Sequence, residues 1–212
     1  MYIKVCGMRE AENIREVEAL GPDLMGFIFW PKSSRFVTER PAYLPRKARR
    51  VGVFVDEHLE RVREIARDYA LDFIQLHGHE SPEYISSLKA PDRPVCGCAT
   101  AALPVIKAFN IATAADLAQT EPYEGLADLF LFDTRGKSVG GNGSKFDWTV
   151  LNDYNGTTPF ILSGGIGPDD AEQLRAFHHP KCTGIDLNSR FELAPGLKDI
   201  TALQKFFTEL NR

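Results

Sequence analysis

The 212-residue sequence lacks the features that mark several large classes of protein. It has only four cysteines, Cys6, Cys96, Cys98 and Cys182, which are too sparse for the disulfide framework of a small secreted domain. No segment approaches the roughly 18 uninterrupted apolar residues of a membrane-spanning helix, and nothing resembles a secretory signal. We therefore expect a cytoplasmic protein without a membrane partner.

An excess of positive charge is also missing. Acidic side chains outnumber basic ones by 29 to 25, so the formal net charge is −4 at pH 7. Proteins that bind the nucleic-acid backbone carry a basic patch or an excess of Lys and Arg. We expect no nucleic-acid partner, and any anionic ligand must be held by a local site.

Metal-binding and dinucleotide-binding motifs are incomplete or absent. Cys96 and Cys98 are one residue apart with no second pair nearby, which is a poor pattern for zinc. His77 and His79 resemble the paired histidines of some metal-dependent barrels, but the other histidines fall away from the expected strand ends. No Gly-x-Gly-x-x-Gly follows the first expected strand. We expect no metal site and no dinucleotide site.

What the sequence does have is an alternation of short β-type runs and longer amphipathic ones. This pattern is typical of repeated βα units around a parallel sheet. Strands are expected at Tyr2–Cys6, Leu24–Phe29, Val51–Val55, Phe73–Leu76, Val105–Phe109, Leu129–Asp133, Phe160–Ser163 and Gly184–Asp186. Helices are expected at Glu10–Leu20, Arg40–Lys47, Leu59–Tyr69, Pro82–Lys89, Ala114–Gln119, Trp148–Tyr154, Pro168–Phe177 and Asp199–Leu210.

Eight such strands predict an α/β fold, a (β/α)8 TIM barrel near the lower length limit of that fold. No linker or change of composition divides the chain, so a single domain over residues 1–212 is expected. An open doubly wound sheet is the alternative. In a barrel the catalytic groups lie at the C-terminal ends of the strands, which here are Cys6, Trp30, Asp56, His77, Asn110, Asp133, Ser163 and Asp186.

Three local signals predict where helices begin or end. Ser81 precedes Pro82 in the order of an N-cap and a first-turn proline. Asp56 can cap the helix that follows the third strand. Gly21 and Pro22 predict a stop after the first helix.

A glycine-rich turn follows the seventh expected strand. Residues 163–167 read Ser-Gly-Gly-Ile-Gly and lead into a helix. Glycines let a phosphate approach the backbone, while free N–H groups and the helix dipole supply positive potential. Residues 187–192, after the eighth strand, would complete the pocket, because barrel phosphate sites often use these two loops. A turn without a ligand is the alternative.

Candidate acid–base groups end the first and sixth strands. Free cysteine is most often a small buried residue, so Cys6 alone indicates little. Asp133 follows an apolar run, where desolvation would favour the protonated acid, although an ordinary loop carboxylate is an equal alternative. Arg35 can grip a carboxylate, but a solvated arginine is the more common outcome. Residues 136–143 resemble a glycine-rich loop that closes over a ligand, or a surface loop.

Together these motifs resemble the phosphoribosylanthranilate isomerase family, (β/α)8 enzymes of tryptophan biosynthesis. The resemblance implies an Amadori rearrangement of N-(5-phosphoribosyl)anthranilate to 1-(2-carboxyphenylamino)-1-deoxyribulose 5-phosphate, by general acid–base catalysis without a metal or organic cofactor. It spans nearly the whole chain, at residues 4–8, 26–29, 34–37, 51–54, 75–78, 132–134, 140–143, 146–148, 162–166, 184–186 and 195–199.

The resemblance also implies roles for individual residues. Asp133 would be the general acid that protonates the sugar ring oxygen, and Cys6 the general base that removes the proton from C2. These roles demand a carboxyl group kept protonated and a thiol poised towards the thiolate. Substrate-binding residues would be Arg35 for the anthranilate carboxylate, Asp186 for sugar hydroxyls, His77, and, for the phosphate, Gly164, Gly165, Ser189 and Arg190. Arg190 stands where the family usually has glycine.

Two other functions stay open. The isomerase of histidine biosynthesis performs the same rearrangement on a different aminoaldose with two aspartates, and Cys6 argues against it. A catalytically silent sugar-phosphate-binding barrel is the second, and the presence of Cys6, Asp133 and Arg35 together argues against it. Either a monomer or a homodimer is compatible with the sequence.

Overall fold

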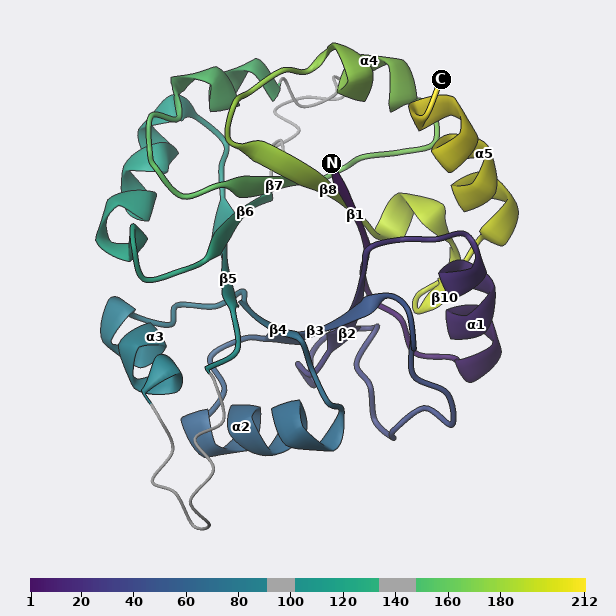
Figure 1. The fold of residues 1–212 in the computed structure, drawn as a ribbon, viewed down its shortest axis with the longest axis horizontal. Coiled ribbons are helices and arrows are strands. Elements are labelled where there is room, and N and C mark those ends of the chain that lie inside the picture. The colour runs from purple at the N-terminus through teal and green to yellow at the C-terminus, as the bar shows by residue number, and fades with distance from the viewer. Residues whose placement is uncertain (91–101, 134–147) are drawn as a thin grey trace.

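The computed structural model describes residues 1–90, 102–133 and 148–212 (Figure 1). Within them, eight parallel strands close into a barrel in sequence order, and β8 pairs with β1. The predicted (β/α)8 barrel is therefore confirmed, and the open sheet is excluded. Cys96, Cys98 and residues 136–143 lie outside the described residues. The strands are β1 (Tyr2–Val5), β2 (Leu24–Ile28), β3 (Arg49–Phe54), β4 (Phe73–Leu76), β5 (Val105–Asn110), β6 (Leu129–Asp133), β7 (Phe160–Ser163) and β8 (Cys182–Leu187).

Helices surround the ring of strands (Figure 1). They are α1 (Ala11–Ala19), α2 (Leu59–Asp68), α3 (Pro82–Lys89), the 3-10 segments η1 (Ala114–Tyr123) and η2 (Trp148–Asp153), α4 (Ala171–Ala176) and α5 (Ile200–Leu210). After β8 come a 3-10 turn, η3 (Ser189–Phe191), and a hairpin of β9 (Glu192–Ala194) and β10 (Leu197–Lys198). The helices expected after the fifth and sixth strands are thus 3-10 segments, and Pro122 lies inside η1. Among the described helices none has the length and apolarity to cross a bilayer.

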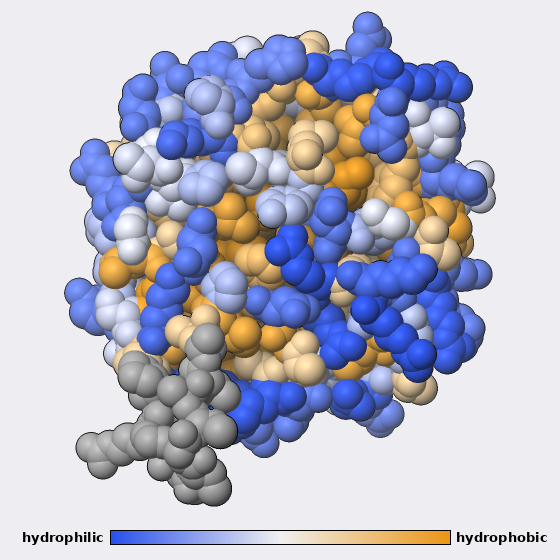
Figure 2. Space-filling model, viewed as in Figure 1, coloured by the Kyte–Doolittle hydropathy of each residue, from blue (hydrophilic) through white to orange (hydrophobic). Residues whose placement is uncertain are grey.

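Side-chain alternation along the strands separates an inner core from an outer one. The outer core packs between strands and helices, and polar residues cover most of the periphery when the molecule is seen down the barrel (Figure 2). Successive strand residues point to opposite faces, so Asp133 follows Leu131 inward and Ser163 follows Ile161 inward. The apolar interior therefore ends in polar groups at the C-terminal mouth. The inner core consists of Leu24, Val51, Phe73, Ile106, Ala108, Leu129, Leu131 and Ile161.

The connection between β2 and β3 contains no helix, so the prediction of a helix at Arg40–Lys47 was wrong. Pro41 and Pro45 stand four residues apart in this segment, and a proline inside a helix removes a backbone donor and clashes with the preceding turn. Glu18 on α1 binds the segment instead, because its Oε1 accepts the backbone N–H groups of residues 46–48 at 2.6 to 3.2 Å.

Two of the three predicted helix ends are confirmed. Ser81 accepts a backbone N–H from the first turn of α3 at 3.3 Å, and Gly21 follows α1 with a φ of +83°. Asp56 does not cap α2, because His58 occupies that position. Asp56 instead has a φ of +50° and accepts the backbone N–H of His79, which joins the ends of β3 and β4.

Replacing Glu18 with alanine should destabilise the barrel, because backbone donors of the β2–β3 connection lose their acceptor. We expect the free energy of unfolding to fall by about 1–3 kcal/mol in urea titrations. Burial alone would raise the pKa of Glu18, but hydrogen bonds from Tyr43 and backbone N–H groups lower it. A carboxyl group with a lowered pKa stabilises the fold above its ordinary pKa and loses this effect as pH falls through the lowered value.

The difference in the free energy of unfolding between wild type and Glu18→Ala should therefore reach its maximum at pH 7 and decrease below about pH 4. The matched control is Glu16→Ala, an exposed residue of the same helix, which should leave stability nearly unchanged. Equal unfolding curves for Glu18→Ala and Glu16→Ala at pH 7 would contradict this account of the connection.

Candidate active site

A cavity of about 480 Å³ opens at the C-terminal end of the barrel. Of the eight predicted strand ends, only Asp56 lies outside its wall. The fold also brings in the loops after β2, β7 and β8, so groups distant in sequence face one space. The predicted residues in the wall are Cys6, Trp30, Arg35, His77, Asn110, Asp133, Ser163, Gly164, Gly165, Asp186, Ser189 and Arg190.

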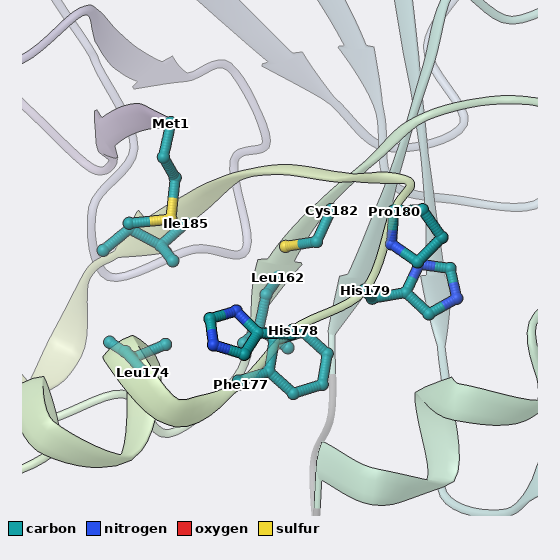
Figure 3. Close-up of a pocket in the computed structure, with 9 residues that line it drawn as sticks. All are labelled: Met1, Leu162, Leu174, Phe177, His178, His179, Pro180, Cys182 and Ile185. Carbon is teal, nitrogen blue, oxygen red and sulfur yellow. The ribbon is translucent and has the colours of Figure 1, made fainter.

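A second hollow, of about 380 Å³, lies at the opposite end of the barrel (Figure 3). Met1, Cys182 at the start of β8, and Phe177 and His178 after α4 contribute to its wall. The lining is mostly apolar and contains no carboxylate or arginine. His178 and His179 also line it, but no carboxylate, arginine or lysine accompanies them, whereas the cavity at the C-terminal end combines all the predicted site residues.

Cys6 lies directly after β1 and is only 3% exposed. Gly26 on the neighbouring strand makes room for it, because a Cβ at Gly26 would lie 2.7 Å from the Cys6 Sγ. Gly7 then turns the chain with a φ of +78°, a conformation that favours glycine. Glycines on both sides therefore allow the thiol to reach the cavity wall.

A buried ion pair shapes the electrostatics of the thiol. Lys4 Nζ is 2.9 Å from Asp186 Oδ1, and both side chains are buried. Asp186 Oδ2 also accepts a hydrogen bond from Ser163 Oγ at 3.3 Å. Burial raises the pKa of Cys6, and the charge of Lys4 opposes this increase without cancelling it. The expected thiol poised towards the thiolate is thus not what the structure has, because desolvation is the larger effect.

Asp133 ends β6 and faces His77 at the end of β4. Asp133 Oδ2 and His77 Nε2 are 3.7 Å apart, and Asp133 is 5% exposed. His77 Nδ1 is 3.4 Å from the Gln75 side-chain amide nitrogen. Gln75, which sequence reasoning did not single out, is buried in the same wall. An imidazole therefore stands beside the predicted general acid.

His77 and His79 have different partners, because His77 faces Asp133 and His79 lies beside Asp56. The His79 Nδ1 lies 3.1 Å from Asp56 Oδ2, and the His79 side chain is 97% exposed. Across residues 1–90, 102–133 and 148–212, no three His, Cys, Asp or Glu side chains cluster in a way that could hold a metal ion.

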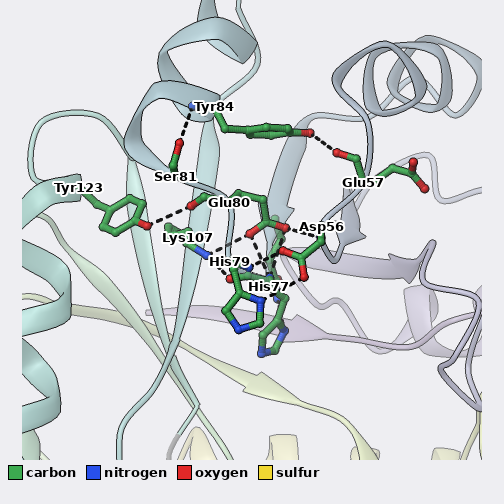
Figure 4. A network of polar contacts seen from close by, with 11 residues as sticks. Asp56, Glu57, His77, His79, Glu80, Ser81, Tyr84, Lys107 and Tyr123 are labelled. Atoms are coloured by element: carbon green, nitrogen blue, oxygen red, sulfur yellow. Dashed lines mark hydrogen bonds and ion pairs between the residues drawn. The ribbon is translucent and has the colours of Figure 1, made fainter.

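A second buried ion pair holds the loop that carries His77 (Figure 4). Glu80 Oε2 and Lys107 Nζ are 3.0 Å apart, with side chains 1% and 3% exposed. Glu80 also accepts the backbone N–H groups of Asp56 at 2.9 Å and Gly78 at 3.0 Å. Lys107 donates to the Gly78 carbonyl at 2.7 Å. The ends of β3, β4 and β5 are therefore joined beneath one loop.

Arg35 is not a solvated surface arginine, because it binds a carboxylate of the protein. Glu192 Oε1 and Oε2 lie 2.9 and 3.0 Å from Arg35 Nε, and Oε2 also contacts Arg35 Nη2. Glu192 accepts a further hydrogen bond from Lys198 Nζ at 2.7 Å. No local sequence signal identifies this cluster, since Arg35 and Glu192 are 157 positions apart.

The glycine turn after β7 forms another part of the wall. Gly164 and Gly165 have φ values of +95° and +68°, and Asp170 Oδ2 accepts the Gly167 N–H at 2.7 Å. Arg190 lies over this turn, since a Cβ at Gly167 would be 3.3 Å from the Arg190 Nε. A charged group therefore accompanies the turn that the sequence predicts to bind phosphate.

Comparisons with known proteins identify the family of this chain. The family model described as N-(5'-phosphoribosyl)anthranilate (PRA) isomerase matches residues 3–209. The chain belongs to this isomerase family. An N-(5'-phosphoribosyl)anthranilate isomerase of Phocaeicola vulgatus is 49% identical over 100% of the chain and 98% of that protein. One of Parabacteroides distasonis is 49% identical over 99% and 93%.

Solved structures of the same family share the fold. A phosphoribosyl anthranilate isomerase in complex with reduced 1-(o-carboxyphenylamino)-1-deoxyribulose 5-phosphate has a TM-score of 0.80 and 27% identity, covering 100% of this chain and 98% of its own. The phosphoribosyl anthranilate isomerase of Thermus thermophilus has a TM-score of 0.77 and 30% identity, with the same coverage. The protein is thus an isomerase of tryptophan biosynthesis, as the sequence resemblance predicted.

Removing one member of the Glu80–Lys107 pair should leave the other charge buried and unpaired. We expect Lys107→Met to lower the free energy of unfolding by about 3–5 kcal/mol, measured by urea titration. The double variant Glu80→Gln/Lys107→Met should recover much of this loss. The control is Lys205→Met, whose exposed pairing with Glu209 should contribute less than about 1 kcal/mol. A wild-type curve for Lys107→Met would show that the pair does not hold the loop.

The raised pKa of Cys6 should be visible in its reactivity, because the thiolate is the nucleophile. We expect iodoacetamide to alkylate Cys6 with a midpoint above about pH 8.5, the ordinary cysteine value, as measured on the Cys6 peptide by mass spectrometry. Lys4→Met should move the midpoint higher still, because Lys4 favours the thiolate. A midpoint below that of an unstructured cysteine peptide would contradict the dominance of burial.

Proposed function

We propose that this isomerase converts N-(5'-phosphoribosyl)anthranilate to 1-(2-carboxyphenylamino)-1-deoxyribulose 5-phosphate by general acid–base catalysis. The observation that carries the proposal is the single cavity wall in which Cys6, Asp133, Arg35 and the turn at residues 163–167 come together. The related structure that holds a reduced form of this product supports the same class of ligand, a phosphosugar joined to a carboxyphenylamine.

In the first step, Asp133 donates a proton to the furanose ring oxygen. The bond from C1 to that oxygen breaks, and the nitrogen lone pair forms the C1–N double bond of a Schiff base. A buried position is the environment expected for a carboxyl group that begins the cycle protonated. His77 is proposed to bind the substrate, and its Nε2 lies 3.7 Å from Asp133 Oδ2, beside the proposed position of the furanose ring.

In the second step, the Cys6 thiolate removes the proton from C2. The electron pair of the broken C2–H bond forms a C1–C2 double bond, and the π pair of the C1–N double bond returns to nitrogen as a lone pair, which neutralises the positive charge and gives an enolamine. The enolamine then tautomerises to the ketone, as C1 gains a proton and the hydroxyl on C2 loses one. A raised pKa makes the thiolate scarce at neutral pH but more basic when it forms, which suits abstraction from a carbon acid.

The remaining residues of the proposal bind the two ends of the substrate and its sugar. Arg35 takes the anthranilate carboxylate, where a guanidinium can donate two parallel hydrogen bonds. Asp186, whose carboxylate lines the cavity while it is bound by Lys4 and Ser163, contacts sugar hydroxyls. The backbone at Gly164 and Gly165, with Ser189 and Arg190, binds the phosphate. None of these steps calls for a metal or an organic cofactor.

The proposal extends to the setting of the enzyme. Residues 1–212 act as one domain in the cytoplasm, as a monomer or a homodimer, without a nucleic-acid or membrane partner. A related isomerase of Thermotoga maritima is described both as a dimer and as monomers.

The proposed roles predict large losses of turnover when either group is removed. Cys6→Ala and Asp133→Asn should each lower kcat by roughly 10²–10⁴-fold, as expected when one general acid or base is lost. Turnover can be followed through the loss of anthranilate-type fluorescence. Cys182→Ala, at the opposite end of the barrel, is the control and should retain wild-type rates. Wild-type rates in both active-site variants would refute the mechanism, and an inactive wild type would favour a silent phosphate-binding barrel.

A further inference from the structure

One edge of the Arg35 guanidinium is already occupied by Glu192. Arg35 Nε and Nη2 form this edge, and both contact the Glu192 carboxylate. Within the residues that the structure describes, Arg35 Nη1, which forms the second edge together with Nη2, donates no hydrogen bond. A guanidinium carries five N–H donors in a planar fork and can therefore bind one carboxylate on each edge.

We propose that Glu192 is a positioning residue that presents the second edge of Arg35 to the carboxylate of the substrate. The inference rests on the proposed function, in which Arg35 binds the anthranilate carboxylate. Two parallel hydrogen bonds from Nε and Nη2 fix the plane of the guanidinium. With the plane fixed, the remaining donors point in one direction within the cavity wall that Arg35 lines.

Glu192 is itself held rigidly. Its carboxylate accepts hydrogen bonds from Lys198 Nζ at 2.7 Å and from the Gly196 N–H at 3.1 Å, and its side chain is 4% exposed. Lys198 is fully buried and also donates to Asn188 Oδ1 at 2.8 Å. The Lys198 backbone N–H and carbonyl are both bound by the Asn13 side chain on α1. The position of Glu192 thus derives from three separate segments of the fold.

The charges of this cluster do not cancel. Arg35 and Lys198 are cationic groups and Glu192 is anionic, so the three ionised side chains sum to +1. Burial lowers the pKa of Lys198, and its ion pair with Glu192 opposes that decrease. Hydrogen bonds and the two cations lower the pKa of Glu192 against the effect of burial, so it is ionised at neutral pH. One ligand carboxylate would neutralise the cluster, which favours a monoanionic group at this point of the cavity.

A rival interpretation makes Glu192 a competitor that the substrate must displace from Arg35. Displacement would leave a buried carboxylate without its arginine, at a large energetic cost. The aliphatic part of Arg35 also packs on the turn after Cys6, since a Cβ at Gly7 would lie 2.7 Å from Arg35 Cδ. The cluster therefore holds Arg35 beside the segment that carries the proposed base.

The experiment compares two substrates in Glu192→Gln. One is N-(5'-phosphoribosyl)anthranilate, and the other is N-(5'-phosphoribosyl)aniline, which lacks the carboxylate. We expect KM for the anthranilate substrate to rise about tenfold or more with a much smaller fall in kcat, since ground-state binding is what weakens. KM for the aniline substrate should stay as in wild type. A general loss of structure would instead impair both substrates.

Further variants complete the test. Glu12→Gln, an exposed residue of α1, is the matched control and should behave as wild type towards both substrates. Arg35→Lys keeps the charge but not the fork, so it should raise KM for the anthranilate substrate alone, which tests the proposed role of Arg35 itself. If Glu192→Gln does not fold, Glu192→Asp, which keeps the charge on a shorter side chain, should show the selective increase in KM for the anthranilate substrate.

The outcomes separate the two proposals. An unchanged KM in Glu192→Gln, with wild-type turnover intact, would overturn the positioning role while leaving the proposed function standing. A lower KM would show that Glu192 competes for Arg35. An inactive wild type would overturn the proposed function and this inference with it.

Discussion

The pairing of β8 with β1 is the contact on which the rest of the site depends. It closes the barrel and places Lys4 opposite Asp186 in register, so that two residues 182 positions apart form a buried ion pair. The Cys6 N–H then donates to the Leu187 carbonyl at 2.8 Å, which continues the same ladder past the end of β1. Without closure the thiol would have neither its cation nor its position.

Three buried ion pairs lie around the mouth of the barrel in the described part of the chain. Lys4 pairs with Asp186, Lys107 with Glu80, and Lys198 with Glu192. The first two join separate strands or loops, whereas the third lies within the β9–β10 hairpin and connects it to Arg35 through Glu192. Because desolvation offsets much of the attraction within such pairs, their value lies in defining where loops sit more than in stabilising the fold.

Burial and nearby positive charges have opposite effects on the pKa of Cys6 in the cavity. Desolvation raises the pKa of Cys6, which makes its thiolate a stronger base. The charge of Lys4 limits that increase and so favours formation of the thiolate. Arg35, Arg190 and the glycine turn line the same cavity and are the groups proposed to bind the anionic ends of the substrate. The apolar interior of the barrel makes these electrostatic effects strong, because little water screens them.

The sequence by itself determined the eight strands and their ends, most of the helices between them and the glycine turn, because side-chain alternation and glycine conformations are local. It also determined the family, through motifs spread along the chain. It did not determine the connection at Arg40–Lys47. Two prolines disfavour a helix there, and hydrogen bonds from the backbone to Glu18 hold the segment instead.

Only the tertiary structure decided which charges meet. Arg35 finds Glu192 across 157 positions, and burial by several strands sets the pKa direction of Cys6. Partners and desolvation are properties of closure and packing, so a pattern read along the chain cannot contain them.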